Sequence, residues 1–575
     1  MHQGLSGRRN YRCAKKNAYD YQKELHRLRL MYCSLPGQLH QSGSGTDENQ
    51  GMGLDQTKPG MNTQVTRQLH NFHGGLVFET YKDITSKIVA IQHPLPQKII
   101  LPLRQHIGIP AVPVVKIGDY VLKGQLIARA DGYVSIPLHA STSGKVIDIG
   151  DYPVPHAGKA LATCIVIKPD GEERWADIEP TENFLSIDPK QLQEIIRSSG
   201  IAGLGGAGFP AHVKLNEGVV NVVDTLIING VECEPYITCD DRLIREKAHY
   251  VVAGTRMIRH AVQARQCVIA VEEDMPEAYA ALAQWIDDDI ELIKVPTRYP
   301  SGGEKQLIQV ITGKEVPSGG LAIHIGIVMH NVATAAAVYR AVTRGEPVIS
   351  RYVTITGKVG TPRNLQVLLG TPVSDCLRAC GYEHNENHRV IMGGPMMGIH
   401  INNPDIPVIK TTNCILVKEI QPIPAEMPCI RCGNCVDVCP IKLLPQQLYW
   451  HARSENLEET KKFHIFDCIE CGCCSYVCPS HIPLVQYYRY AKTRIAAEER
   501  KREGADHARQ RFMQRQHRLE EEAQEKLLPQ VSTISESDSL IADPDIIKSY
   551  IEAAVARTRD KRHQSRITDL EDKDG

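Results

Sequence analysis

The sequence has few aromatic residues, and it lacks a long apolar run. Phe, Trp and Tyr together make up 5% of the 575 residues, and no apolar segment approaches the ~18 residues of a membrane-spanning helix. An excess of charge of one sign is also missing, since 66 Lys and Arg residues face 67 Asp and Glu residues. A nucleic-acid or anionic-membrane partner is therefore not expected, and contact with a membrane would run through partner proteins.

Cysteine, in contrast, is abundant, and eight of the 18 cysteines form two runs of identical spacing. The segments CIRCGNCVDVCP and CIECGCCSYVCP both follow C-x2-C-x2-C-x3-C-P. This spacing is typical of bacterial ferredoxins, in which four thiolates hold each cluster. We therefore predict two [4Fe–4S] clusters and the transfer of single electrons. The predicted ligands are Cys429, Cys432, Cys435, Cys439, Cys468, Cys471, Cys474 and Cys478.

The fourth cysteine of each run precedes a proline, and in this pattern it ligates the cluster of the other run. One predicted set of ligands is Cys429, Cys432, Cys435 and Cys478. The other set is Cys468, Cys471, Cys474 and Cys439. Zinc sites and disulfide frameworks also use paired cysteines, but neither explains the CxxxCP element. Cys473 is out of register, and we interpret it as a buried thiol.

The ends of the chain differ from its centre. Residues 1–70 mix basic residues with Gly, Ser and Gln, which predicts a disordered extension, with Met61 as an alternative start. The Arg8-Arg9 pair is not followed by the apolar stretch of an export signal. Since iron–sulfur clusters are assembled in a reducing compartment, we expect the cytoplasmic side. Residues 486–575 predict a charged helix, either solvated or partner-binding, and then a mainly disordered tail.

Two modules of different periodicity precede the cysteine runs. Residues 71–180 contain short alternating strands with glycine turns, which resemble the barrel-sandwich module of biotinyl and lipoyl domains. Their lysine attachment site is missing, so a structural or docking role is expected. Residues 181–345 alternate helix-like and strand-like segments, which predicts a mostly parallel α/β sheet. Residues 346–415 return to β structure, and residues 416–485 hold the cysteine runs.

A second chemical signal lies in GLGGAGFPAHVK, which ends at Lys214. Its glycines fit G-x-G-x-x-G, but a dinucleotide-binding loop should follow a strand. The preceding segment QLQEIIRSS has the pattern of a helix instead, so a standard Rossmann loop is not expected. Closely spaced glycines before a helix still let backbone N–H groups approach an anion. The segment predicts a site for a phosphate-bearing cofactor, and a glycine turn that serves packing alone is the alternative.

Further motifs follow in a fixed order: NGVECEP, YPSGGE and HNVAT. Together with the glycine segment, they resemble the flavoprotein subunit of respiratory complex I, which binds FMN and NADH. Over residues 70–528, the whole chain resembles the RnfC/RsxC family of the Rnf/Rsx ion-translocating electron transport complex. The resemblance implies a multidomain α/β and β protein. Its modules would be a barrel-sandwich domain, a complex-I-flavoprotein-like domain, a β-grasp (SLBB-like) domain and a two-cluster ferredoxin domain, followed by the helical and disordered tail.

The resemblance also implies cofactor-binding residues. The FMN phosphate would be held by Gly203, Gly205, Gly206, Gly208 and Lys214. The flavin would be contacted by Asn229, Asn331 and Phe209. The ribityl chain or the nicotinamide nucleotide would be faced by Glu232, Glu234 and Glu304, with Tyr299 and Gly302 in the same YPSGGE loop. Each of these residues could instead serve only its own loop or the core.

The implied function is electron transfer from NADH to FMN, to the two clusters and then to membrane subunits, coupled to ion translocation. The chain would be a peripheral subunit on the cytoplasmic side of the inner membrane, and its partners would be integral membrane and iron–sulfur subunits. The alternatives are a soluble diaphorase and a non-catalytic wiring or scaffold subunit with a degenerate flavin and NADH site. Val231 and Gly303 depart from the acidic residues of complex I and favour the scaffold alternative.

Overall fold

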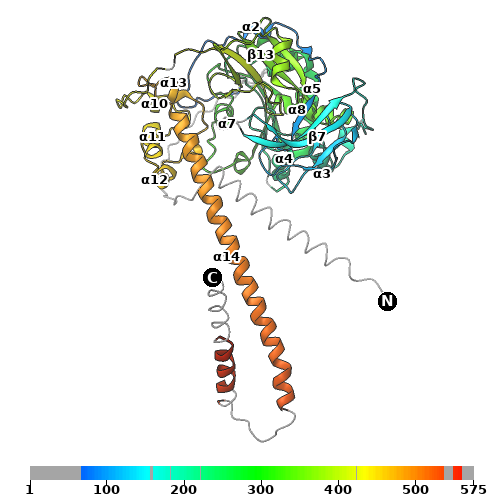
Figure 1. Ribbon diagram of the computed structural model, residues 1–575. Helices are drawn as coiled ribbons and strands as arrows, with labels where there is room; N and C mark the ends of the chain where they lie inside the picture. Colours follow the sequence, from blue (N-terminus) through cyan, green and yellow to red (C-terminus); the bar gives the residue numbers. More distant parts are fainter. Residues whose placement is uncertain are drawn as a thin grey trace, which may run out of the picture. The chain divides into compact units, whose positions relative to one another are not determined.

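The computed structural model describes residues 67–155, 160–181, 183–220, 222–422, 424–535, 545 and 548–559 (Figure 1). The chain divides into two units, residues 1–496 and residues 497–575. The prediction of disorder over residues 1–70 lies almost entirely outside the described residues.

The first module is built from short antiparallel strands, as the alternating pattern predicts. Glycines form its turns: Gly118 and Gly124 adopt φ values of +99° and +79°, which only glycine reaches without strain. Apolar side chains such as Val121, Ile127 and Ile165 point inward and are fully buried. One sheet contains β2 (Ile99–Pro102), β8 (Leu161–Pro169), β7 (Gly144–Pro153) and β4 (Tyr120–Val121). The other contains β3 (Val112–Pro113), β5 (Leu126–Arg129) and β6 (Leu138–His139).

The second module is an α/β domain around a four-stranded sheet in which all neighbours are parallel. The sheet is covered on both faces, so its strands are continuous apolar runs. Leu226 and Ile228 of the central strand share one core with α5 and α8, whereas Ile227 lies in the core that contains α7. The strand order is β11 (Glu291–Val295), β10 (Gln266–Glu272), β9 (Thr225–Gly230) and β12 (Ile327–Asn331). The helices are α3 (Pro189–Ser198), α4 (Ala211–Val220), α5 (Cys239–Val262), α6 (Pro276–Ala283), α7 (Glu304–Thr312) and α8 (Val332–Arg344), with 3-10 turns η1 (Phe184–Ser186) and η2 (Ala322–Ile325).

The third module is a mixed six-stranded sheet with one short helix, α9 (Val373–Ala379), packed on its core. Its edge strand β1 comes from the N-terminal segment of the chain and pairs in parallel with β14. The strand order is β1 (Ile91–Gln92), β14 (Arg363–Leu368), β13 (Ser350–Gly357), β17 (Cys414–Glu419), β15 (His388–Met392) and β16 (Ile399–Ile401). The short helix α2 (Asp83–Ser86) precedes β1.

The fourth module carries the cysteine runs on short helices. These are α10 (Asn434–Asp437), α11 (Pro445–Arg453), α12 (Leu457–Lys462), η3 (Ile465–Asp467) and α13 (Cys473–Tyr476). The long helix α14 (Leu484–Ser535) follows, and its first turns bury Tyr488, Ala491 and Ile495 in the same core as α11. The predicted charged helix is therefore present. Residues 548–559 are also helical, and the rest of the predicted disordered tail lies outside the described residues.

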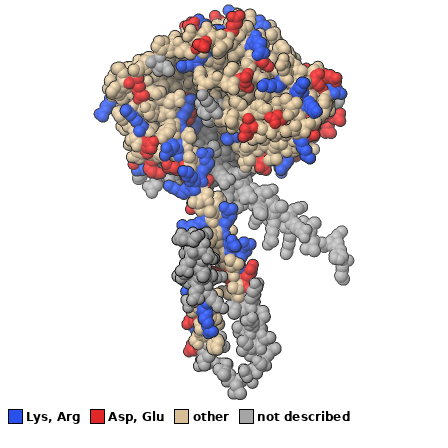
Figure 2. Space-filling model, viewed as in Figure 1, with Lys and Arg blue, Asp and Glu red and all other residues tan. Residues whose placement is uncertain are grey.

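The surface agrees with the balanced composition. On the face drawn in Figure 2, Lys and Arg side chains are interspersed with Asp and Glu side chains. Within the described part of the chain, no helix combines the length and the apolar character needed to cross a membrane.

One buried lysine joins the first three modules. Lys410, which precedes β17, donates through Nζ to the carbonyl oxygens of Gly200 (2.7 Å) and Pro137 (3.3 Å). Its backbone N–H donates to Gln105 Oε1 at 3.1 Å. Burial lowers the pKa of Lys410 to about 7, because a charged ammonium loses its hydration inside the protein.

This lysine predicts a pH-dependent stability. In the unfolded chain its pKa is about 10.4, so between pH 7 and that value the unfolded state binds the extra proton. Stability should therefore rise with pH across this window, by up to about 1.4 kcal/mol per pH unit. The substitution Lys410→Met should remove this rise, whereas Lys190→Met at an exposed position should keep it. Calorimetric melting of the three proteins between pH 6.5 and 9 measures the effect, and an unchanged rise in Lys410→Met would contradict the assignment.

Candidate functional site

The glycine segment forms a closed loop between α3 and the N-terminus of α4. The N–H of Gly203 donates to the Phe209 carbonyl at 2.7 Å, and Ala202 bridges to Pro210. A helix precedes the loop, as the sequence predicts, so this is not a standard Rossmann turn. Gly205 and Gly206 lie exposed at the tip. Gly206 has φ +107°, and a Cβ there would meet no atom within 4 Å, so its backbone faces open space beside a helix N-terminus, where an anion is favoured.

Lys214 lies in the first turn of α4, and the structure pairs it with another predicted residue. Its Nζ donates to Glu304 Oε1 at 2.9 Å and to the Met329 carbonyl at 3.3 Å. Glu304 is the first residue of α7. The predicted phosphate-binding cation and one predicted acidic residue therefore meet beside the carboxyl ends of the sheet strands.

Asn229 and Asn331 end the adjacent parallel strands β9 and β12, and they are register partners. Asn229 Nδ2 donates to the Gly302 carbonyl at 2.9 Å, which ties the YPSGGE loop to the sheet. Asn331 caps α8 by accepting from Ala333 N–H at 2.8 Å. A Cβ on Gly205 would lie 3.1 Å from Asn331 Cβ, so the glycine loop and both asparagines share one edge of the sheet. Ligands of open α/β sheets bind at this edge.

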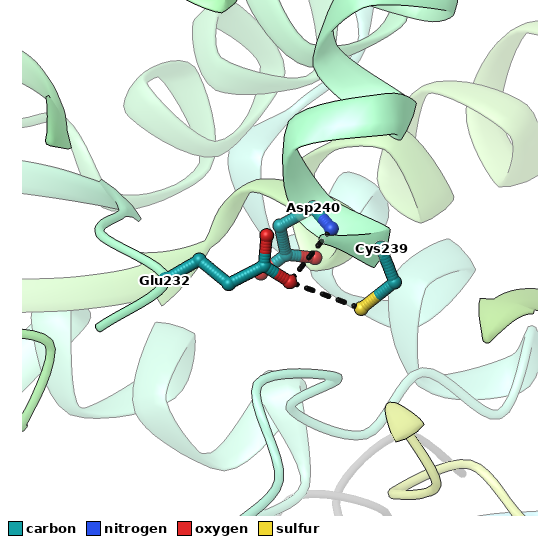
Figure 3. A group of neighbouring side chains, drawn as sticks. All are labelled: Glu232, Cys239 and Asp240. Carbon is teal, nitrogen blue, oxygen red and sulfur yellow. Dashed lines mark hydrogen bonds between the residues drawn. The ribbon is translucent and has the colours of Figure 1, made fainter. Parts of the chain in front are cut away.

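Glu232 lies in a buried polar cluster with Cys239 and Asp240 at the start of α5 (Figure 3). Glu232 Oε1 accepts from Asp240 N–H at 3.0 Å and from Cys239 Sγ at 3.3 Å. Burial, followed by the nearby Asp240, raises the pKa of Glu232 to about 8. Its oxygens are already used to cap a helix. Sequence reasoning missed Asp240, whose Oδ2 accepts from Asn331 Nδ2 at 2.6 Å; the signal available was its place just after the NGVECEP motif.

Two predicted cofactor residues contact neighbouring modules instead of the glycine loop. Glu234 Oε1 accepts from the N–H groups of Met396 and Met397 at 2.7 and 3.0 Å. The buried Tyr299 hydroxyl donates to the Cys471 carbonyl at 2.7 Å. Phe209 is half-buried directly after the loop glycines. For these three residues, contact with a cofactor stays a prediction.

The two cysteine runs adopt the same backbone conformation, which repeats position by position. Three positive φ values recur in the corresponding places of the two runs. They are +57° and +58° at Arg431 and Glu470, +89° and +83° at Gly433 and Gly472, and +54° and +52° at Lys442 and His481. The runs therefore form a pseudo-symmetric pair of ligand loops.

The cysteines gather across the two runs. One cavity is lined by Cys439 of the first run together with Cys468, Cys471 and Cys474. Burial raises the pKa of Cys435, and the charges of Cys432, Cys429 and Cys478 raise it further, which places Cys478 near the first run. These neighbours support the crossed ligation that the sequence predicts. Cys473 is fully buried and also lines the cavity.

The two crossed groups differ in exposure. We call Cys439, Cys468, Cys471 and Cys474 the inner quartet; three of them are 7–8% exposed, and Cys468 is half-buried. We call Cys429, Cys432, Cys435 and Cys478 the outer quartet; none is fully buried, and Cys432 is exposed. Each quartet offers four soft donors, and amides reach inner sulfurs: Leu443 N–H to Cys439 Sγ (3.3 Å) and Glu470 N–H to Cys468 Sγ (3.4 Å). This donor set fits iron–sulfur clusters.

Four family models match the chain in the order of the four modules. The RnfC barrel sandwich hybrid domain matches residues 70–172, and the Nuo51 FMN-binding domain matches residues 196–340. The SLBB domain matches residues 352–400, and the 4Fe-4S dicluster domain matches residues 428–482. The predicted fold class is confirmed. Fold and site together define a redox protein that joins an FMN-binding domain to an iron–sulfur domain.

Curated relatives identify the family. The RnfC protein of the ion-translocating oxidoreductase complex from Pseudomonas aeruginosa is 46% identical over 78% of this chain and 59% of its own length. A relative of the same name from Rhodobacter capsulatus is 44% identical over 69% of this chain and 77% of its own length. The chain belongs to the RnfC family of ion-translocating oxidoreductase complexes, as the resemblance implied. It spans about 59% of the length of the first of these relatives.

A solved NAD+-reducing [NiFe]-hydrogenase matches 55% of this chain and 63% of its own chain, with 16% identity and a TM-score of 0.39. This likeness is too distant to carry a functional argument.

Proposed function

We propose that the protein accepts electrons from NADH at an FMN and passes them, through two [4Fe–4S] clusters, to other subunits of an ion-translocating membrane complex. The proposal rests on family membership and on one structural observation: a single loop connects the candidate flavin site to the inner quartet. At one end of the loop, Gly302 is bound by Asn229. At the other end, Tyr299 is bound to Cys471.

FMN, when bound, would supply the conversion between two-electron and one-electron chemistry. The side chains and backbone of this protein would position it. The exposed N–H groups of Gly205 and Gly206, at the N-terminus of α4, would hold the phosphate with Lys214. Because Lys214 is already paired with Glu304, an arriving phosphate would share this lysine or displace the carboxylate.

The inner quartet would be the first to receive electrons, because it faces the α/β domain. Lys305 Nζ, next to Glu304 in the chain, lies 3.4 Å from Asp467 Oδ1, immediately before Cys468. The outer quartet, with exposed Cys432, would deliver electrons to a partner. We place the protein at the cytoplasmic face of the inner membrane, held by integral membrane and iron–sulfur subunits, because the relatives are named as subunits of an ion-translocating complex.

The test is a spectrum of the purified chain with iron and flavin quantified, followed by anaerobic addition of NADH. We expect one FMN per chain and NADH-dependent bleaching of the cluster absorbance. Dithionite serves as the control, since it reduces the clusters directly. Bleaching by dithionite without flavin or any response to NADH would instead identify a non-catalytic wiring subunit.

A further inference from the structure

The backbone carbonyls of three inner-quartet cysteines are bound by side chains from outside the two cysteine runs. The Cys471 carbonyl accepts from Tyr299 Oη at 2.7 Å. The Cys439 carbonyl is bound by His73 Nδ1 at 2.9 Å, and the Cys468 carbonyl by Lys492 Nζ at 2.7 Å. Because a carbonyl only accepts, the proton of the His73 ring lies on Nδ1 in this contact.

The outer quartet lacks this feature. Among the hydrogen bonds of the described residues, no side chain donates to the carbonyl of any outer-quartet cysteine. The difference matters because hydrogen bonds, charge and solvent exposure around the sulfurs set the reduction potential of an iron–sulfur cluster. The two clusters would therefore differ in potential for a reason that the chain itself provides.

Tyr299 stands out among the three donors, because it alone comes from the loop beside the candidate flavin site. Its side chain is 3% exposed, and its backbone exchanges two hydrogen bonds of 2.8 Å with Leu76. Three residues further on, Gly302 is held from both sides: its carbonyl accepts from Asn229 Nδ2 at 2.9 Å, and its N–H donates to Cys233 Sγ at 3.3 Å. The tyrosine is thus fixed at both its backbone and its hydroxyl.

We propose that Tyr299 is a positioning residue for the inner cluster: its hydroxyl fixes the Cys471–Gly472 peptide and raises the reduction potential of that cluster. The physical reason is electrostatic. An O–H group that donates to a ligand carbonyl draws negative charge away from the cluster environment, which stabilises the reduced, more negative state. This role of Tyr299 rests on the proposed function in that the inner cluster is the one next to the flavin.

Tyr299→Phe removes only the hydroxyl, and Tyr488→Phe is its matched control. Tyr488 is also buried, lines the same cavity, and donates to a carbonyl at 2.7 Å, but that carbonyl belongs to Pro445 and not to a cluster ligand. A purely structural effect would appear in both variants. We expect a lower potential for the inner cluster in Tyr299→Phe and an unchanged potential in Tyr488→Phe.

The measurement is a redox titration followed by EPR, with chemical mediators and dithionite in place of NADH. It can therefore succeed even when the protein shows no response to NADH, an outcome that would overturn the proposed function alone. The variant Cys478→Ala, which removes an outer-quartet ligand, assigns the remaining signal to the inner cluster.

A second variant guards against loss of the cluster in Tyr299→Phe. His73→Phe removes the donor to the Cys439 carbonyl and should lower the same potential. The proposal is overturned when Tyr299→Phe leaves the inner potential unchanged, when Tyr488→Phe lowers it equally, or when the shift falls on the outer cluster.

Discussion

Replacing Cys478 with alanine is expected to remove the cluster that depends on Cys429, Cys432 and Cys435, and to leave the sequence-adjacent cluster intact. Cys478 follows Cys474 closely in the chain, yet its charge acts on Cys435 of the other run. The cavity beside Cys468, Cys471 and Cys474 is completed by Cys439 instead. Loss of one thiolate from a quartet should therefore cost about four of about eight iron atoms per chain.

EPR of the reduced protein, with iron quantified, tests this expectation. The mirror variant Cys439→Ala should remove the inner cluster, and Cys473→Ala should keep both, since Cys473 is out of register. Spin coupling between the clusters should vanish in either single-cluster variant. If Cys478→Ala abolished the inner cluster and kept the outer one, ligation would not be crossed.

The cysteine ligation could be predicted from the sequence because it is local. Ligand loops of fixed spacing fold in the same way wherever they occur, as the repeated φ values of Gly433 and Gly472 show. The parallel sheet was also predictable, since β9 and β10 are apolar runs separated by an amphipathic helix. Both signals lie within short stretches of the chain.

Contacts between modules could not be predicted in this way. Tyr299 and Glu234 belong to motifs that resemble a flavin site, but their side chains are bound by Cys471 and by the loop at Met396. These partners lie 172 and 162 positions away in the chain. No periodicity in the sequence encodes how one module packs on another. The same holds for Lys410, whose partners come from two other modules.

Replacing Gly206 with valine is expected to abolish flavin binding and NADH-dependent reduction while both clusters remain. Gly206 has φ +107° and faces open space at the tip of the glycine loop. A β-branched residue is strained there by about 1–3 kcal/mol, and its side chain would occupy the space that a phosphate needs. Each 1.4 kcal/mol corresponds to about a tenfold loss of affinity, so strain and steric exclusion together should weaken FMN binding by roughly 100-fold or more.

Gly118 provides a matched control for this substitution. It is exposed, has φ +99°, and a Cβ there would also meet no atom within 4 Å, but it lies in a turn of the barrel-sandwich module. Gly118→Val should therefore suffer the same backbone strain and still retain its flavin. Flavin released on denaturation, titration of FMN into the flavin-free protein and iron content distinguish the variants. Wild-type FMN affinity in Gly206→Val would show that the loop does not hold the phosphate, whereas equal loss in both variants would trace the defect to general strain rather than to the site.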